Sequence, residues 1–250
     1  MSLIAPAVIG GLVTLPYWLG PALVHRSARM PLVMAMEHIG PDEVAALDAH
    51  TFETLETAVS TLTAMGFDRP TAFRARDGAT TAVGALLEHP VHGDLASFAI
   101  MRAPSVAPQA LPLFESEWDD GFRVLTTNSR QASVFPRSPA VDAMTLPTVR
   151  ELDALYRIHR ARVARARTSA ERLHLSRGED ALTIERNRQA RDRLRHLASG
   201  YLLREGDGVR PTVRGACLMA WRSLPPWKNL QFRERDRREA ALLQELGATA

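Results

Sequence analysis

The first 24 residues contain no charged side chain, and the stretch from Leu3 to Val24 is mostly apolar. This length matches the roughly 20 apolar residues that a helix needs to cross the hydrocarbon core of a bilayer. His25, Arg26 and Arg29 follow at once, and the positive-inside rule then places the N-terminus outside and the rest of the chain in the cytoplasm. The sequence therefore predicts an N-terminal membrane anchor in residues 1–30, as a single-pass span or as an anchor that lies in the plane of the membrane. The residues expected to form this anchor are Leu3, Ile9, Leu12, Tyr17, Trp18, Leu23, Arg26 and Arg29.

Prolines and glycines interrupt the same stretch and leave two alternatives open. In the first, the stretch is a helical hairpin that breaks near Pro16 and is buried in the core of a soluble cytoplasmic protein, because a lone span has few neighbours that can satisfy a broken backbone. In the second, it is a cleaved signal peptide, although no basic residue precedes it and no clear cleavage site lies before Arg29.

Charge divides the remaining chain into two parts. Residues 25–149 hold 9 arginines against 15 acidic residues, for a net charge of −6, whereas residues 150–250 hold 22 basic and 13 acidic residues, for a net charge of +9. The basic part is expected to meet nucleic acid, anionic lipid or the acidic part of the same chain. A single cysteine, Cys217, excludes an internal disulfide and any multi-cysteine zinc site.

Residues 31–135 predict a small acidic α+β domain. Apolar residues recur at three- and four-residue steps from Pro41 to Gly66, which indicates one amphipathic helix. The stretches that follow are rich in β-forming residues and bounded by turn residues, and Asp120-Gly121 marks a hairpin. We therefore expect an antiparallel sheet with the helix packed on one face.

Few residues in this domain suggest chemistry. His89 and His92 form a weak candidate for a metal site, because Pro90 between them disfavours the helical turn that would bring them together. With Asn128 they mark where an enzyme site is expected if the chain has one, whereas the acids of residues 115–120 are expected to form a solvated face. No P-loop, dinucleotide fingerprint or nucleophile elbow is present, so the sequence predicts no cofactor and identifies no small-molecule substrate.

Residues 136–147 carry three prolines and predict an extended linker at the point where the charge changes sign. Residues 148–250 then predict a basic helical domain. Its first helix is expected to begin at Thr148, because Glu151 completes a capping-box pattern, and His159 lies on its apolar stripe as an expected core histidine. A second helix is acidic at its start and basic at its end, as the helix dipole favours.

A β-hairpin is predicted in residues 201–213, after the second basic helix. Its parts are the strand from Leu202 to Arg204, the turn Gly206-Asp207-Gly208 and the strand from Val209 to Thr212, with Gly215-Ala216 opening the next helix. In this order, residues 185–222 resemble the end of a winged-helix domain, in which a recognition helix precedes a two-stranded wing.

The winged-helix resemblance implies nucleic-acid contacts. Arg188, Arg191 and Arg195 would face DNA, and Arg210 would reach a phosphate or the minor groove. The alternative is an ordinary hairpin beside a packed helix, since the residues before the basic helix supply no obvious second helix of the right length.

An aromatic and basic segment lies near the C-terminus. Trp227 and Lys228 are expected to meet anionic lipid, because tryptophan favours headgroup depth; alternatively the tryptophans pack on the core. The leading hypothesis is a membrane-associated, bacterial-type interaction or scaffolding protein rather than an enzyme, with a protein partner as a further option. The alternatives are a winged-helix-like nucleic-acid-binding regulator and an enzyme with a polar site around His89, His92 and Asn128.

Overall fold

The computed structural model of the chain describes residues 4–77, 79–104, 106–130, 135–136, 138–166, 170–171 and 180–247, and for residues 4–14 it describes the backbone only. The described residues form seven helices and ten strands, which confirms the predicted α+β fold class. The chain divides into two compact units. Unit 1 comprises Met1–Val33, Ala132–Pro136 and Gln189–Arg235, and unit 2 comprises Met34–Gln131, Arg137–Arg188 and Asp236–Ala250.

These units differ from the predicted division at residues 30, 136 and 147. The N-terminal segment belongs with the hairpin of residues 201–213, and residues 148–188 belong with the acidic sheet. Both groupings join segments far apart in the chain, which the change of charge along the sequence does not reveal.

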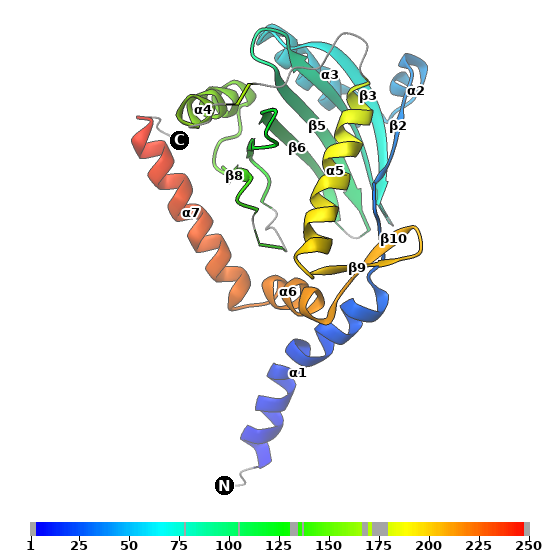
Figure 1. Cartoon of the computed structure of the whole chain (residues 1–250), viewed down its shortest axis with the longest axis vertical. Coiled ribbons are helices and arrows are strands. Elements are labelled where there is room, and N and C mark those ends of the chain that lie inside the picture. The colour runs from blue at the N-terminus through cyan, green and yellow to red at the C-terminus, as the bar shows by residue number, and fades with distance from the viewer. Residues whose placement is uncertain are drawn as a thin grey trace. The chain divides into compact units, whose positions relative to one another are not determined.

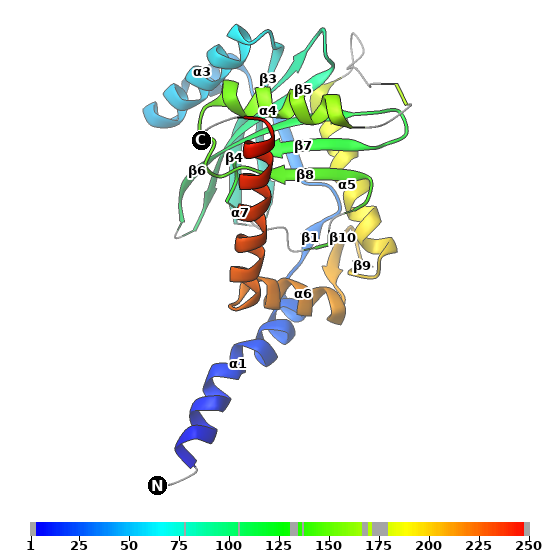
Figure 2. The ribbon, with the colours of Figure 1, turned by 90° about the vertical axis from the view of Figure 1, so that its left-hand side faces the viewer.

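A seven-stranded sheet forms the centre of unit 2 (Figure 1). Its strands follow the order β2-β3-β4-β5-β6-β7-β8 and are antiparallel at every step except the parallel pair β7 and β8 (Figure 2). The predicted hairpin at Asp120-Gly121 is confirmed, and Gly121 has a positive φ of 79° that suits glycine. The strands are β2 (Ala35–His38), β3 (Asp68–Asp77), β4 (Thr80–His89), β5 (Asp94–Ala103), β6 (Val106–Glu117), β7 (Arg123–Thr127) and β8 (Val141–Thr145).

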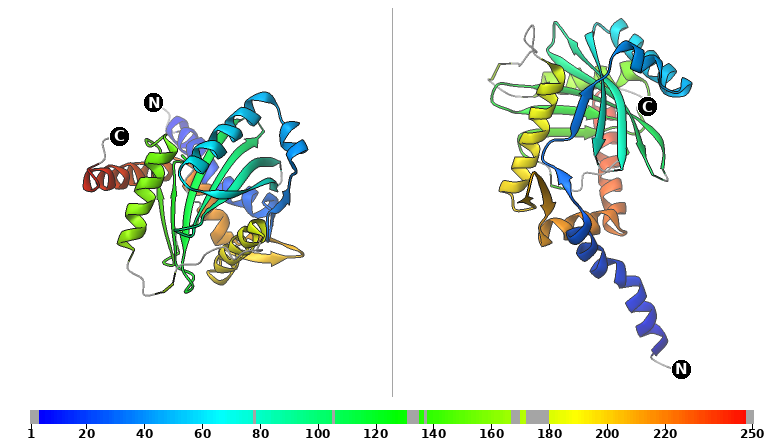
Figure 3. Two further views of the ribbon diagram at one scale, coloured as in Figure 1. Left: turned by 90° about the horizontal axis from the view of Figure 1, so that it is seen from above. Right: turned by 90° about the vertical axis from the view of Figure 1, so that its right-hand side faces the viewer.

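Helices cover both faces of this sheet. Helices α3 (Ala49–Ala64) and α4 (Leu152–Arg165) lie on one face, and the part of α5 (Ala181–Ala198) that belongs to unit 2, up to Arg188, lies on the other (Figure 3). Leu62, Phe114 and Leu155 belong to the larger buried cluster between α3, α4 and the strands. On the opposite face, the first turn of α5 packs against β3, β4 and β5. The sheet is therefore buried on both sides, and polar side chains along its strands need partners inside the fold.

Two predicted helix starts are corrected. The helix expected from Pro41 to Gly66 is two helices, α2 (Pro41–Ala45) and α3, because the carboxylate of Asp48 accepts the backbone N–H of Thr51 and opens a new helix. That backbone hydrogen bond also lowers the pKa of Asp48. Helix α4 begins after Glu151, whereas Thr148 donates its backbone N–H and its hydroxyl to Glu239.

Unit 1 is built around a small three-stranded sheet of order β1-β10-β9. The predicted hairpin is confirmed as β9 (Leu202–Glu205) and β10 (Gly208–Pro211), and β1 (Met30–Pro31) adds a strand that the sequence did not indicate. Helix α1 (Ile4–Ser27) packs along α6 (Val213–Ser223), and the part of α7 (Trp227–Glu245) that belongs to unit 1, up to Arg235, follows α6. A small core between these elements contains Phe135, Leu202 and Val209.

No helix in the described part of the chain is both long enough and apolar enough to cross a membrane. The prediction of a single-pass transmembrane helix in residues 1–30 is therefore wrong. The physical reason lies in the composition of the described turns of α1. Pro16, Tyr17, Gly20 and Pro21 dilute its apolar residues, and Pro21 is buried in unit 1.

Candidate functional site

A hydrogen-bonded row of buried polar side chains connects α4 to strands β5, β6 and β7. His159 is fully buried, with its Nε2 atom 2.9 Å from Ser116 Oγ and its Nδ1 atom 2.9 Å from Thr126 Oγ1. Ser116 donates its hydroxyl to Asp94 over 2.5 Å, and Tyr156 donates to the second oxygen of Asp94 over 2.9 Å. The expectation that His159 is a core histidine is confirmed.

The direction of each hydrogen bond shows which roles these buried polar side chains can have. Because Ser116 gives its hydrogen to Asp94, its oxygen must accept from His159 Nε2–H, and His159 Nδ1 then accepts from Thr126. Arg162 Nη1 donates to Thr126 over 2.6 Å, so every member has a partner. In nucleophilic catalysis the histidine accepts the serine proton instead. The observed order therefore suits a structural connection between α4 and the sheet.

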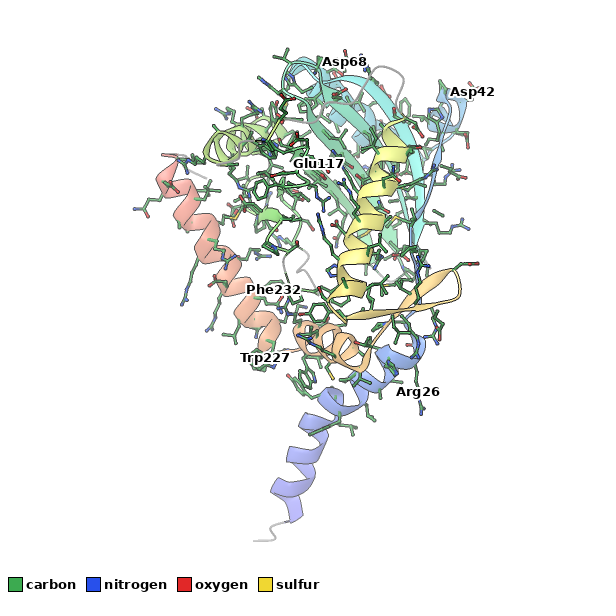
Figure 4. The ribbon with its side chains drawn as sticks, in the orientation of Figure 1. Arg26, Asp42, Asp68, Glu117, Trp227 and Phe232 are labelled. Carbon is green, nitrogen blue, oxygen red and sulfur yellow. The ribbon has the colours of Figure 1, made fainter. Side chains whose placement is uncertain are left out.

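A buried ion cluster lies on the other face of β6, beneath α5. Arg188 Nε is 2.6 Å from Glu117 Oε2 and 3.3 Å from Glu115 Oε1, and Arg123 Nη1 is 3.3 Å from the same oxygen of Glu115. Figure 4 shows Glu117 at the end of β6. Burial alone would lower the pKa of Arg188, but Glu115 and Glu117 outweigh it and raise the pKa above its usual value. These glutamates are thus buried partners of arginine rather than the solvated face that the sequence predicted.

The arginines named for nucleic acid are mostly engaged with carboxylates. Arg188 belongs to unit 2 and to the ion cluster, whereas Arg191, Arg195 and Arg210 belong to unit 1. Arg195 pairs with Asp192 of its own helix over 3.1 Å. Arg210 Nε is 3.1 Å from Glu205 Oε1, and Arg210 Nη1 is 3.2 Å from His25 Nε2.

The structure does not bring the predicted enzyme residues together. The rings of His89 and His92 lie in contact at the turn between β4 and β5, with centroids 4.3 Å apart and a tilt of 33° between their planes. Asn128 follows β7, three strands away in the sheet order, and donates to the carbonyl of Val149 over 3.2 Å. Within the described ranges, no group of three or more histidine, cysteine or acidic side chains is placed to hold a metal ion.

Helix α1 turns its apolar face outward in unit 1. The exposed residues of its described turns include Leu15, Trp18, Leu19 and Leu23, with Trp18 76% exposed, and Arg26 is the first charged residue of this face. The packed residues, Tyr17, Gly20, Pro21 and Val24, recur at three- and four-residue steps on the side that meets α6. Leu3 lies outside the described residues, as do the side chains of Ile9 and Leu12. Arg29 forms an ion pair with Glu205.

A hydrogen bond explains how α1 is held against α6. Pro21 has no backbone N–H, so the carbonyl of Tyr17 lacks its helical donor four residues later. Trp221 fills that position, because its Nε1–H donates to Tyr17 O over 2.9 Å. A Cβ atom at Gly20 would lie 3.3 Å from Ala220 Cβ, which shows how closely the two helices approach. The orientation of the apolar face is therefore specified by packing.

Unit 1 has a net positive charge. Its residues include 12 basic and 4 acidic side chains, for a net charge of +8, whereas the net charge of unit 2 is −5. Within the described residues of unit 1, five exposed cations have no carboxylate within ion-pair distance. They are Arg26, Arg204, Arg214, Lys228 and Arg233.

Comparison with known proteins gives no family for this chain. No protein-family model, curated protein or solved structure matches it. The proposed function therefore rests on the structure and charge of the two units.

A half-buried histidine makes the stability of unit 1 depend on pH. Burial lowers the pKa of His196, whose ring lies 4.6 Å from that of Phe135. The unfolded chain then binds this proton more readily than the folded chain, so this contribution is complete above the unfolded pKa of about 6.5 and is lost as pH falls below it. We expect His196→Gln to weaken the loss of thermal stability between neutral and mildly acidic pH. An unchanged pH dependence, equal to that of the exposed-site variant His50→Gln, would contradict this assignment.

Proposed function

We propose that the chain is an interaction protein that attaches to an anionic lipid surface through unit 1, lying on the surface without crossing it. The observation that carries this proposal is the outward face of α1, where Leu15, Trp18, Leu19 and Leu23 are exposed beside Arg26. Helices that lie in a membrane interface combine such an apolar face with basic residues.

Exposed apolar residues on one helix face need an explanation that scattered ones do not. Single exposed apolar side chains are common on protein surfaces, whereas a continuous patch marks an interaction site. Moving a leucine or tryptophan side chain from water into an apolar layer contributes up to about 1.5–3 kcal/mol when burial is complete. Tryptophan also favours headgroup depth, which suits Trp18 near the basic end of the helix.

Charge supports the choice of an anionic surface. Each lysine or arginine close to such a surface contributes about 1 kcal/mol at physiological salt. Unit 1 has a net charge of +8, and its exposed cations without carboxylate partners include Arg26 and Lys228. The acidic unit 2, with a net charge of −5, lacks this attraction.

The same charge would also attract nucleic acid, but two observations favour lipid. Arg188, Arg195 and Arg210 all have carboxylate partners, so a contact with phosphate would have to break an existing ion pair. The apolar face of α1 has no role in tracking a phosphate backbone, whereas it fits the acyl boundary of a lipid layer.

Vesicle co-sedimentation tests the proposal. We expect the chain to pellet with vesicles of phosphatidylcholine and phosphatidylglycerol, and the double variant Trp18→Ser/Leu19→Ser to bind about tenfold more weakly, since 1.4 kcal/mol corresponds to a factor of ten. A matched control removes two exposed valines from unit 2, Val91→Ser/Val106→Ser, and should bind as the unaltered chain does.

Three results would contradict this function. The first is that the unaltered chain does not pellet with anionic vesicles, and the second is that the α1 variant and its control bind these vesicles equally well. The third is that the chain binds duplex DNA in preference to the vesicles. Circular dichroism of each variant confirms that its fold is retained, because all four replaced side chains are exposed.

A further inference from the structure

We infer that unit 1 has a second lipid contact at the first turn of α7, which we call the α7 corner and define as Trp227, Lys228 and Leu230. This inference rests on the proposed attachment of unit 1 to anionic lipid and adds where a headgroup is bound. The corner is separate from the outward face of α1 and is expected to contribute on its own.

The α7 corner exposes large apolar side chains on an ordered helical turn. Residues 225–230 are all exposed, including Trp227 at 52% and Leu230 at 49%. Trp227 and Leu230 are three residues apart and therefore share one side of the helix. Figure 4 shows Trp227 where α6 gives way to α7. Within the described residues, neither side chain belongs to the small buried core of unit 1.

Hydrogen bonds fix the corner before any ligand arrives. The backbone N–H of Lys228 donates to Leu224 O over 2.9 Å, and that of Leu230 donates to Pro226 O over 3.0 Å. The side chain of Gln231 donates to Arg222 O over 3.4 Å. A contact surface that is already ordered loses less conformational entropy on binding, which favours affinity.

The charged residue of the corner fits an anionic headgroup. The Nζ atom of Lys228 lies 5.7 Å from the ring centroid of Phe232 (labelled in Figure 4), and within the described chain no carboxylate lies within ion-pair distance of it. A phosphate or glycerophosphate can therefore approach Lys228 without breaking an ion pair. Trp227 beside it combines an apolar ring with an N–H donor, the combination that favours headgroup depth.

The structural link to α1 favours lipid as the occupant over a protein partner. Helix α6 contacts α1 through Gly20 and through the hydrogen bond from Trp221 to Tyr17, and only three residues separate the end of α6 from the start of α7. The corner and the outward face of α1 are thus held on one packed assembly of helices. Both combine exposed tryptophan and leucine with cations, the combination that favours a lipid interface.

Vesicle binding separates this inference from the proposed function. The variant Trp227→Ser/Leu230→Ser should bind vesicles of phosphatidylcholine and phosphatidylglycerol about threefold to tenfold more weakly, as expected for the loss of two side chains that are partly buried in the lipid layer. Lys228→Gln should weaken binding to these vesicles, and its effect should disappear in high salt. The valine variant of unit 2, Val91→Ser/Val106→Ser, again serves as the matched control.

The outcomes for the two contacts are distinguishable. If the α1 variant loses binding while the corner variants bind like the control, the second contact is refuted and the proposed function stands. If the unaltered chain does not bind at all, the proposed function fails and the corner fails with it. Loss of binding in both the α1 and the corner variants, with the control unaffected, supports both contacts.

Discussion

Replacing Glu117 by alanine is expected to lower the free energy of unfolding by about 3–5 kcal/mol, because it leaves Arg188 as a buried charge without its nearest partner. Arg188 is only 8% exposed and Glu117 only 1%. Glu115 remains within 3.3 Å of Arg188, but it would then be shared with Arg123. Urea unfolding followed by circular dichroism measures the change.

A paired replacement provides the decisive comparison for the ion cluster. Glu117→Leu/Arg188→Met removes both charges together and leaves Glu115 with Arg123, so it should recover most of the stability that Glu117→Ala loses. The exposed pair of Glu37 and Arg74 is the surface control, and Glu37→Ala should cost about 0–1 kcal/mol. If Glu117→Ala costs no more than Glu37→Ala, the cluster does not stabilise unit 2.

Replacing His159 by leucine is expected to cost roughly 2–5 kcal/mol, because it leaves the hydroxyls of Ser116 and Thr126 without their shared partner in a fully buried site. Each buried polar group left without a partner costs about 1–3 kcal/mol. The exposed His50 of α3 supplies the control, and His50→Leu should leave the free energy of unfolding nearly unchanged. Equal effects of the two replacements would show that the hydrogen bonds of His159 do not hold α4 to the sheet.

Local patterns predicted much of the secondary structure. Turn residues between β-rich stretches located the hairpin at Asp120-Gly121 and the hairpin of residues 201–213, both of which are confirmed. These features depend on residues close together in the chain, and such patterns can be read directly from sequence. The break before Asp48 was missed, because one capping side chain outweighed an apolar period that continues across it.

The buried clusters could not be predicted, since their members are far apart in the chain. Asp94, Ser116 and His159 meet only through the register of β5 and β6 and the placement of α4. Arg188 was assigned to a nucleic-acid face because its helix is basic, yet it turns toward Glu117. The spacing of Glu115 and Glu117 along β6 is one signal in the sequence for the ion cluster. Acids two residues apart share one face of a strand, and that face is buried here.

Composition alone predicts the wrong structure for the N-terminal segment, because it does not show how the helix packs. An uncharged stretch of this length suggests a span, but the described turns of α1 place Tyr17, Gly20 and Pro21 against α6. The apolar residues that remain form an outward face on one side only. Packing on one side and apolar exposure on the other favour a helix that lies on a surface.

Quenching of tryptophan fluorescence by brominated phospholipids tests the central claim most directly, because it reports whether Trp18 enters a lipid layer. Trp227 of the α7 corner is exposed as well, so Trp227→Phe is compared with Trp18→Phe/Trp227→Phe on anionic vesicles, and the buried Trp118 of unit 2 is an internal unquenched fluorophore. We expect strong quenching in Trp227→Phe and a clear reduction when Trp18 is replaced as well. Equal quenching in the two proteins, or none in either, would show that the outward face of α1 does not meet lipid.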